Sequence, residues 1–342
     1  MALWRAGFHL KFILDANIMG SENALKRYVH QFKKLKVDRS KGVAPHKPIL
    51  LLSIMGGYED GSIDNGRIHV TPELVGAFKS LWNQLVDSPH HLIFALPFFH
   101  MRSEPFWEVH PKAGFINFVR YSRSIRQLST LLSCIEYAEI DSELHNLLLI
   151  KESRKILQTE LLEYYFKQTK HGSKLQLNTF LDSITAEIKQ KSSEEYKAIM
   201  KLKEGKMDTL DFEEERFVRS GVFKREVPKL FNYTCAISEL RIDNLSSFTA
   251  IDACHIVPFA ESNDDTLSNG ISLCPNLHRA FDRGIISIDS NLRVLIKNFI
   301  VEPYSSPYSI LQFNHKKIDL PGGTDYDAYH HNLHMHRVKH GF

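Results

Sequence analysis

The sequence predicts an α+β protein with two domains joined by a helical connector. Its 342 residues exceed the roughly 100 to 200 residues of a typical domain, which favours two domains. Segments with helical periodicity alternate with short apolar runs between turn residues, so both helices and strands are expected. The clearest pattern lies in residues 252–289, where a strand-like run, a turn, the apolar run 271–273 and a helical repeat follow one another. This order predicts a hairpin followed by a helix.

Composition limits the class of protein. Hydrophobic residues make up 43% of the chain and charged residues 24%, which is typical of a soluble globular protein. The four cysteines are far apart and form no Cys-x-x-Cys pair, so neither a zinc ribbon nor a disulfide framework is predicted, and a reducing cytoplasm is the expected location. The first 20 residues are mildly apolar, but Arg5, Lys11 and Asp15 interrupt them. We therefore expect an extension there, with no signal peptide and no membrane span.

Positive charge is concentrated in two stretches, although the net charge of the whole chain is only +3. Residues 26–47 contain eight Lys and Arg against one acid, Asp38. Residues 216–230 contain five basic residues against Glu226. Such blocks favour a polyanion such as DNA as the partner. The candidate DNA contacts in the second stretch are Arg219, Lys224 and Arg225.

An apolar helix is predicted over residues 45–57, opened by Pro48 and ended by the glycine pair 56–57. Its apolar part is expected to lie in the core. His46 and Lys47 stand just before this helix, where backbone N–H groups without helical partners and the helix dipole favour an anion such as phosphate. This pair is therefore a candidate phosphate contact.

A second helix is predicted to begin with Thr71 as its N-cap and Pro72 in its first position. After it, residues 90–111 are dense in aromatic side chains and proline. We expect a hairpin here, with most of the rings lining the core. The alternative for this stretch is a shallow apolar depression rimmed by His100 and Arg102, in which Arg102 is a candidate DNA contact.

Two motifs in the N-terminal part, PHKPILLL (45–52) and LPFFHMRSEPFW (96–107), resemble the sulfur-binding domain of restriction enzymes that recognise phosphorothioate-modified DNA. In such DNA, sulfur replaces a non-bridging phosphate oxygen. Sulfur is more polarisable and less strongly hydrated than oxygen, so an apolar wall can favour it. The resemblance implies that His46 and Lys47 hold the DNA backbone and that the sulfur pocket consists of Leu96, Pro97 and Phe98. Leu96 stands where the family usually has tyrosine.

Residues 126–215 change character, with helical periodicity and many Glu and Lys pairs. Such a segment is most often a solvated helical connector, and a dimerisation surface is the alternative. We therefore predict a DNA-recognition domain over residues 1–125, a helical connector over 126–215 and a C-terminal domain over 216–342.

Three motifs in the C-terminal part, DACHIVPF (252–259), LSNGISLCPNLHRAFDRGIISID (267–289) and LPGGTDYDAYHHNLHMHR (320–337), look like those of an HNH nuclease of the McrA-like group. The resemblance covers residues 216–342 and implies a ββα-metal fold, in which the hairpin presents one histidine and the helix presents metal ligands. It also implies hydrolysis of DNA in the restriction of foreign or modified DNA.

Phosphodiester hydrolysis needs an activated water, a Lewis acid and a means of aligning them. His255, Asn269 and His278 stand 14 and 9 residues apart and suit these tasks. His255, at the end of the first strand, would accept a proton from the attacking water. Asn269 would hydrogen-bond to the backbone across the hairpin and hold the His255 loop. His278, on the helix, would bind the metal through one ring nitrogen.

A second metal ligand follows from helix geometry, since Asp282 lies four residues after His278 on the same face. A His and Asp pair suits a divalent ion such as Mg²⁺ or Mn²⁺. Many HNH sites carry Asp or His directly before the catalytic histidine, but Cys254 stands at that position here, and a thiolate suits Mg²⁺ poorly. Asp252 is therefore the predicted third ligand.

The predicted function is that of a modification-dependent, type IV-like restriction endonuclease that binds double-stranded phosphorothioate DNA and cuts it at a metal-dependent HNH site. Two alternatives stay open. One is an HNH endonuclease that recognises another modification or unmodified DNA, and the other is a non-catalytic DNA-binding protein with a decayed HNH fold. A homodimer is compatible with the sequence, because paired cuts on two strands favour two HNH centres.

Overall fold

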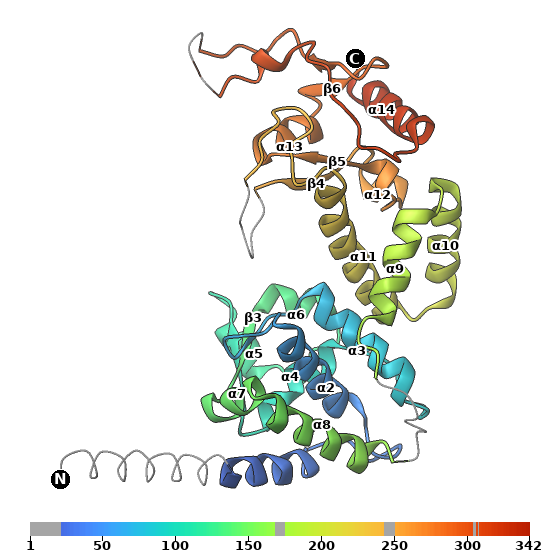
Figure 1. The fold of residues 1–342 in the computed structure, drawn as a ribbon. Coiled ribbons are helices and arrows are strands. Elements are labelled where there is room, and N and C mark those ends of the chain that lie inside the picture. The colour runs from blue at the N-terminus through green and yellow to red at the C-terminus, as the bar shows by residue number, and fades with distance from the viewer. Residues whose placement is uncertain (1–21, 168–174, 243–249, 304–305, 307) are drawn as a thin grey trace, which may run out of the picture. The chain divides into compact units, whose positions relative to one another are not determined.

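The computed structural model describes residues 22–167, 175–242, 250–303, 306 and 308–342 (Figure 1). The predicted N-terminal extension, residues 1–20, lies outside the described residues. Both parts of the chain combine helices with short antiparallel strands, which confirms the predicted α+β class. Contacts divide the chain into two compact units, which are Met1–Leu181 with Thr209–Glu215 (unit 1) and Asp182–Asp208 with Arg216–Phe342 (unit 2).

Unit 1 combines helices with a three-stranded antiparallel sheet of order β1-β3-β2. A helix over residues 22–33 comes first. The elements that follow are α2 (His46–Asp60), β1 (Arg67–Ile68), α3 (Pro72–Leu85), α4 (Ala95–His100), the 3-10 helix η1 (Met101–Ser103), β2 (Trp107–Pro111), α5 (Ile116–Tyr121), α6 (Leu128–Cys134), β3 (Ile135–Ile140), α7 (Ser142–Leu149) and α8 (Lys151–Tyr165).

Helix α2 forms the centre of unit 1 and packs against α3, α4 and α8 (Figure 1). Every residue from Lys47 to Gly56 is buried, so this stretch of the helix has no solvent face. Helix α3 begins as predicted, with Pro72 in its first turn and the Thr71 hydroxyl accepting a hydrogen bond of 3.2 Å from the backbone N–H of Leu74.

The glycine pair at 56–57 does not end helix α2. The helix continues to Asp60 and stops at Gly61, whose φ of 79° is left-handed. A Cβ on Gly56 would lie 2.4 Å from a methyl group of Leu177, and a Cβ on Gly57 would lie 2.6 Å from one of Ile63. The pair is therefore needed for close packing rather than for termination.

The aromatic stretch 90–111 also differs from the predicted hairpin. It contains helix α4 and the short η1, and only its last five residues form a strand, β2. Pro97 lies in the first turn of α4, where a helix needs no N–H group from it, so proline is compatible with the helix. The rings are nevertheless buried as expected, since Phe94, Phe98 and Phe99 have 0% exposure.

Unit 2 contains two separate hairpins and the helices around them. Its elements are α9 (Thr179–Gln190, from Asp182 onward), α10 (Ser193–Lys206), α11 (Thr209–Leu230, from Arg216 onward), β4 (Asp252–His255), α12 (Phe259–Ser262), η2 (Leu267–Asn269), β5 (Gly270–Leu273), α13 (Pro275–Asp282), β6 (Ile286–Ile288), β7 (Val294–Ile296), η3 (Leu311–Phe313) and α14 (Tyr326–His340).

The hairpin β4–β5 with helix α13 has the ββα arrangement that the sequence predicts. The strands are antiparallel, with His255 opposite Gly270, and α13 packs against both of them. Strand β5 is buried along its whole length. Side chains from α11 (Phe223 and Val227) and from α14 (Tyr329) join the same core, so these helices cover the hairpin.

Strand β5 begins with glycine because helix α11 lies directly against it. A Cβ on Gly270 would lie 2.5 Å from a methyl group of Val227 and 3.1 Å from the ring of Phe223. The backbone of Gly270 is extended, with φ of −115°, so the position requires a small residue rather than a left-handed one.

The predicted connector, residues 126–215, packs within the two units. Residues 126–181 and Thr209–Glu215 belong to unit 1, whereas Asp182–Asp208 belongs to unit 2. The functional division into 1–125, 126–215 and 216–342 stays a prediction. Among the described residues, no helix combines the length and the apolar character needed to cross a bilayer.

Candidate active site

His255 is the last residue of β4, and contacts hold its ring on two sides. Its Nε2 lies 2.8 Å from Oδ1 of Asp265, a carboxylate whose side chain is only 3% exposed. The ring also stacks on Phe223 of α11, with centroids 3.9 Å apart and planes at 3°. If Nε2 donates to the carboxylate, Nδ1 is the ring nitrogen that can accept a proton from a reactant. The imidazole is 23% exposed and therefore accessible.

Buried polar side chains continue from Asp265 into helices α10 and α11. The Tyr196 hydroxyl donates to Oδ2 of Asp265 at 3.3 Å and accepts from Nη1 of Arg219, also at 3.3 Å. Nη2 of Arg219 in turn lies 2.6 Å from a carboxylate oxygen of Glu187. Burial, the largest cause, raises the pKa of Tyr196 well above its usual range, so this hydroxyl stays protonated. Asp265 was not among the predicted site residues. In the sequence it is the second residue of an Asp-Asp pair that follows His255, and this pair marks the loop as a source of carboxylates.

Asn269 is fully buried and ties the loop after His255 to the start of β5. Its Oδ1 accepts a hydrogen bond of 2.8 Å from the backbone N–H of Val257, and its Nδ2 donates to the carbonyl oxygens of Val257 and Asp264, each at 2.9 Å. These are backbone contacts of the kind that the sequence predicts for Asn269. They hold the segments that carry both His255 and Asp265.

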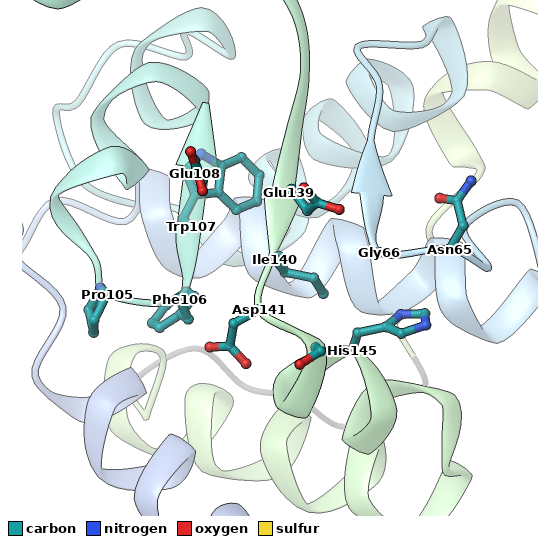
Figure 2. Close-up of a pocket in the computed structure, with 11 residues that line it drawn as sticks. Asn65, Gly66, Pro105, Phe106, Trp107, Glu108, Glu139, Ile140, Asp141 and His145 are labelled. Atoms are coloured by element: carbon teal, nitrogen blue, oxygen red, sulfur yellow. The ribbon is translucent and has the colours of Figure 1, made fainter. Parts of the chain in front are cut away.

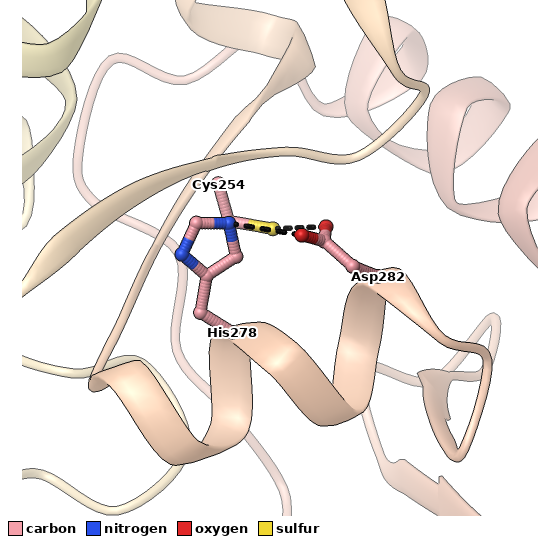
Figure 3. A group of neighbouring side chains, drawn as sticks. All are labelled: Cys254, His278 and Asp282. Carbon is pink, nitrogen blue, oxygen red and sulfur yellow. Dashed lines mark hydrogen bonds and ion pairs between the residues drawn. The ribbon is translucent and has the colours of Figure 1, made fainter. Parts of the chain in front are cut away.

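His278 and Asp282 of α13 meet Cys254 of β4 (Figure 3). Nε2 of His278 lies 3.3 Å from Oδ2 of Asp282, and Sγ of Cys254 lies 3.5 Å from Oδ1 of Asp282. One ligand atom from each residue lies within 4.8 Å of the others. The four-residue spacing therefore brings His278 and Asp282 close enough to share one cation.

Asp252 lies on the other side of the His278 ring. Its Oδ2 is 3.1 Å from Nδ1 of His278, whereas Asp282 is beside Nε2. The two nitrogens of an imidazole point in different directions, so Asp252 does not share an ion with Asp282 at Nε2. Asp252, the predicted third ligand, is not part of the cluster formed by Cys254, His278 and Asp282, and its role as a ligand stays a prediction. Asp252 instead orients the ring, as carboxylates commonly do behind a metal-binding histidine.

The donor set fits a divalent ion held by one nitrogen and one oxygen. His278 and Asp282 offer these atoms, a combination that suits Mn²⁺ and is acceptable to Mg²⁺. Burial raises the pKa of the Cys254 thiol well above its usual range, and the nearby Asp282 raises it further. Without a bound ion, the Cys254 thiol donates a hydrogen bond to Asp282, and its Sγ lies in the same cluster as the ligand atoms of His278 and Asp282.

A cavity of about 300 Å³ in unit 1 brings together four residues that the sequence analysis selected. Leu96 and Pro97 of α4 form part of its apolar wall, and His46 and Lys47 of α2 form part of its polar wall. Lys36, an exposed residue of the basic block 26–47, also lines it. Segments 50 residues apart in the sequence thus meet at one site, as the resemblance to sulfur-binding domains implies.

Neither basic residue of the predicted pair carries an uncompensated charge. Lys47 is 5% exposed, and its Nζ lies 2.5 Å from a carboxylate oxygen of Glu104 and 2.8 Å from the Ser103 hydroxyl. Nε2 of His46 lies 2.8 Å from the carbonyl oxygen of His91. Burial lowers the pKa of His46 to about 4, so its ring is neutral at pH 7. The cavity therefore offers polar groups and a buried ion pair to a ligand.

Two residues predicted near this cavity have other contacts. Phe98 has 0% exposure and packs edge-on against Trp107, with centroids 5.3 Å apart. It belongs to the core and does not line the cavity, so its assignment to the sulfur pocket is wrong. Arg102 donates hydrogen bonds of 2.8 and 2.6 Å to the carbonyl oxygens of Val119 and Ser122. Its guanidinium thus holds the end of helix α5.

The three predicted DNA contacts on helix α11 differ in exposure. Arg219 has 0% exposure and is engaged by Tyr196 and Glu187, so its assignment as a DNA contact is wrong. Lys224 and Arg225 are exposed and stay candidate contacts. The sequence could not distinguish Arg219 from them, because its carboxylate partner lies 32 residues away.

A larger cavity of about 590 Å³ in unit 1 has the wrong charge for DNA. Carboxylates of Glu108, Glu139 and Asp141 line it at the ends of β2 and β3 (Figure 2). Negative charges at this density repel phosphate groups. The size of a cavity therefore does not by itself make it a candidate for binding a polyanion.

Comparison with known proteins gives a family match and similar solved structures. Residues 235–289 match the model of an HNH endonuclease family. The chain is similar to the modification-dependent TagI restriction endonuclease, with 22% identity over 36% of this chain and 38% of that one and a TM-score of 0.27. It is also similar to the type IV phosphorothioation-dependent restriction endonuclease ScoMcrA, with 11% identity over 92% and 99% of the two chains and a TM-score of 0.32. No curated protein matches the chain.

With TM-scores of 0.27 and 0.32, these structural likenesses are too weak to define the arrangement of the whole chain. The matched part of the chain spans 38% of the length of the TagI structure. The family match is more specific, because residues 235–289 include the ββα segment with His255, Asn269, His278 and Asp282. The chain therefore carries an HNH endonuclease domain at residues 235–289.

Proposed function

We propose that this chain is a restriction endonuclease that binds phosphorothioate-modified double-stranded DNA and hydrolyses its phosphodiester bonds at the HNH site. In this proposal residues 1–125 recognise DNA and residues 216–342 cut it. Residues 126–215 connect these two parts. The observation that carries the hydrolytic part is the bond of 2.8 Å between His255 and the buried Asp265 on the ββα unit that also presents His278.

His255 acts as the general base through Nδ1. Asp265 accepts a hydrogen bond from the Nε2–H group and so favours the tautomer in which Nδ1 carries the lone pair. The same carboxylate stabilises the positive charge that the ring acquires when it takes a proton from water. The stack on Phe223 limits rotation of the ring, and Asn269 holds the loop that carries Asp265.

His278 and Asp282 would hold the divalent ion, with Asp252 orienting the His278 ring from behind. When bound, such an ion supplies the Lewis acid that offsets negative charge on the phosphate oxygens. We propose Mn²⁺ or Mg²⁺, because the pair contributes a carboxylate and an imidazole.

Recognition of the modification is supported by the resemblance of residues 45–52 and 96–107 and by the 300 Å³ cavity that these segments line. Leu96 and Pro97 give it an apolar wall. His46 is neutral and Lys47 is paired with Glu104, so neither member of the predicted pair gives this wall of the cavity an uncompensated positive charge that would reward an ordinary phosphate oxygen. Weakly hydrated sulfur loses less by entering it.

The test is cleavage of a phosphorothioate plasmid and its unmodified twin with Mg²⁺ or Mn²⁺. We expect wild-type protein to cut the modified plasmid, and His255→Ala to cut neither while binding both as wild type does. Equal cleavage of the two plasmids would favour an HNH endonuclease with a different target. No cleavage by the wild type with any divalent metal would favour a non-catalytic DNA-binding protein.

We further propose that two copies act together on DNA, because one HNH centre per chain suits one strand. Sedimentation of the protein with a single short modified duplex should show two chains per duplex. One chain per duplex, combined with double-strand cleavage, would contradict this part of the proposal.

A further inference from the structure

Residues 112–126, which include helix α5, form a surface segment that is both apolar and basic. The segment contains four basic residues and no acidic residue. Helix α5 exposes large side chains, which are Ile116 (62% exposed), Phe118 (47%) and Tyr121 (76%). Within the helix only Val119 is buried. Adjacent exposed apolar side chains of this size indicate an interaction surface. Their contact with water is unfavourable, and a partner that covers them removes this cost.

Contacts within unit 1 place this segment beside the 300 Å³ cavity. His100 lines the cavity, and its Nε2 lies 3.1 Å from the hydroxyl of Ser124. Arg102 follows on η1 and holds two carbonyl groups at the end of α5. A duplex held at the cavity would therefore meet the segment.

We propose that residues 112–126 are a second DNA-contacting element of unit 1, in which Phe118 and Tyr121 press against the bases in a groove while neighbouring arginines contact phosphates. Apolar wedges flanked by basic residues partly unstack base steps in this way. The proposal rests on the proposed function only in taking DNA as the ligand, and it does not require sulfur recognition or cleavage.

Charge favours DNA over a second copy of the chain as the partner of this surface. The basic residues are Lys112, Arg120, Arg123 and Arg126. In a two-fold interface the same four charges would face each other with no acid in the segment to offset them, and such repulsion is unfavourable. Phosphate groups on either side of a groove would instead neutralise them.

The test measures binding of the full chain, without divalent metal, to an unmodified duplex and to the same duplex with a phosphorothioate, each containing 2-aminopurine as a reporter of unstacking. Tyr121→Ser and Phe118→Ser should each weaken binding to both duplexes by about ten-fold and reduce the rise in 2-aminopurine fluorescence, without changing the salt dependence. Arg123→Gln should instead reduce the slope of log affinity against log salt by about one.

The matched control is Tyr164→Ser, which removes a tyrosine that is 50% exposed on helix α8 of the same unit. If Tyr121→Ser and Phe118→Ser bind as tightly as this control and give the same fluorescence as wild type, the proposal is overturned. It is also overturned if these variants change the oligomeric state of the free protein while DNA affinity is retained. Failure of sulfur recognition looks different, since wild type would then bind both duplexes equally while the variants still lose affinity.

Discussion

Replacing Asp265 by Asn removes one charge beside the proposed general base and changes little else. Asn has the same shape as Asp, and its amide oxygen can accept a hydrogen bond from the Nε2–H group of His255 at the 2.8 Å distance seen for the carboxylate. Its amide nitrogen would face the hydroxyl of Tyr196, which can accept a hydrogen bond from it but loses Asp265 as the acceptor of its own proton. The substitution therefore tests the charge of Asp265 rather than its packing.

The expected loss follows from the burial and distance of the pair. A hydrogen bond to a charged group contributes about 1.5–3 kcal/mol, against about 0.5–1.5 kcal/mol for a neutral one. Coulomb attraction between the carboxylate and a protonated ring about 4 Å away is about 4 kcal/mol at an effective dielectric constant near 20, and this value, which already includes the charged part of the hydrogen bond, is the upper limit of the loss. Since about 1.4 kcal/mol corresponds to a factor of ten, kcat should fall between about 10-fold and 1000-fold. KM for DNA should stay unchanged, because Asp265 is only 2% exposed.

The assay is the initial rate of plasmid nicking as a function of DNA concentration at saturating metal. Asp264→Asn is the matched control, since Asp264 is adjacent and 0% exposed but accepts hydrogen bonds from Ser193 and the backbone of Thr266 rather than from His255. The control should lower the melting temperature and leave kcat near the wild-type value. The reasoning is refuted if kcat of Asp265→Asn lies within two-fold of wild type or falls no further than that of the control.

Three other outcomes are expected in unit 2. Burial lowers the pKa of His336 to about 4, so the unfolded chain binds more protons between about pH 6.5 and 4. The free energy of unfolding should fall by about 3 kcal/mol as pH drops through this window, and urea titrations of His336→Gln should show a flatter dependence. Gly270→Ala should cost about 1–3 kcal/mol by overpacking against Val227, and an unchanged urea midpoint would contradict the close approach. Asp252→Asn should weaken Mn²⁺ binding about 10- to 100-fold in calorimetry, and unchanged affinity would argue against its orienting role.

The parts of the site that the sequence predicted well are those made by neighbouring residues. His278 and Asp282 are one helical turn apart, so any helix brings them together. Asn269 lies 12 residues from Val257 within a single hairpin, and its backbone contacts follow from that short connection. In each case local geometry determines the contact without reference to the rest of the chain.

The predictions that failed concern side chains with distant partners. Arg219 was predicted as a DNA contact, but its guanidinium donates a hydrogen bond to the carboxylate of Glu187, 32 residues earlier. The phosphate contact of Lys47 stays a prediction, but the sequence could not show that Lys47 is paired with Glu104, 57 residues later. Phe98 was expected in a pocket wall, but the packing of α4 directs it against Trp107. A sequence shows that a residue is charged or aromatic, but not which side of its helix becomes the interior.

The sequence by itself determined the α+β class, the ββα order at residues 252–282 and the clustering of an imidazole and a carboxylate on one helix face, because hydrophobic periodicity and short spacings produce these features locally. Only the tertiary structure decided which carboxylate contacts which ring nitrogen of each histidine. Asp265 contacts Nε2 of His255, Asp252 contacts Nδ1 of His278, and Asp282 contacts Nε2 of His278. The physical reason is that an imidazole has two nitrogens on different edges, and the packing of α11 and α13 on the hairpin determines which edge faces each carboxylate.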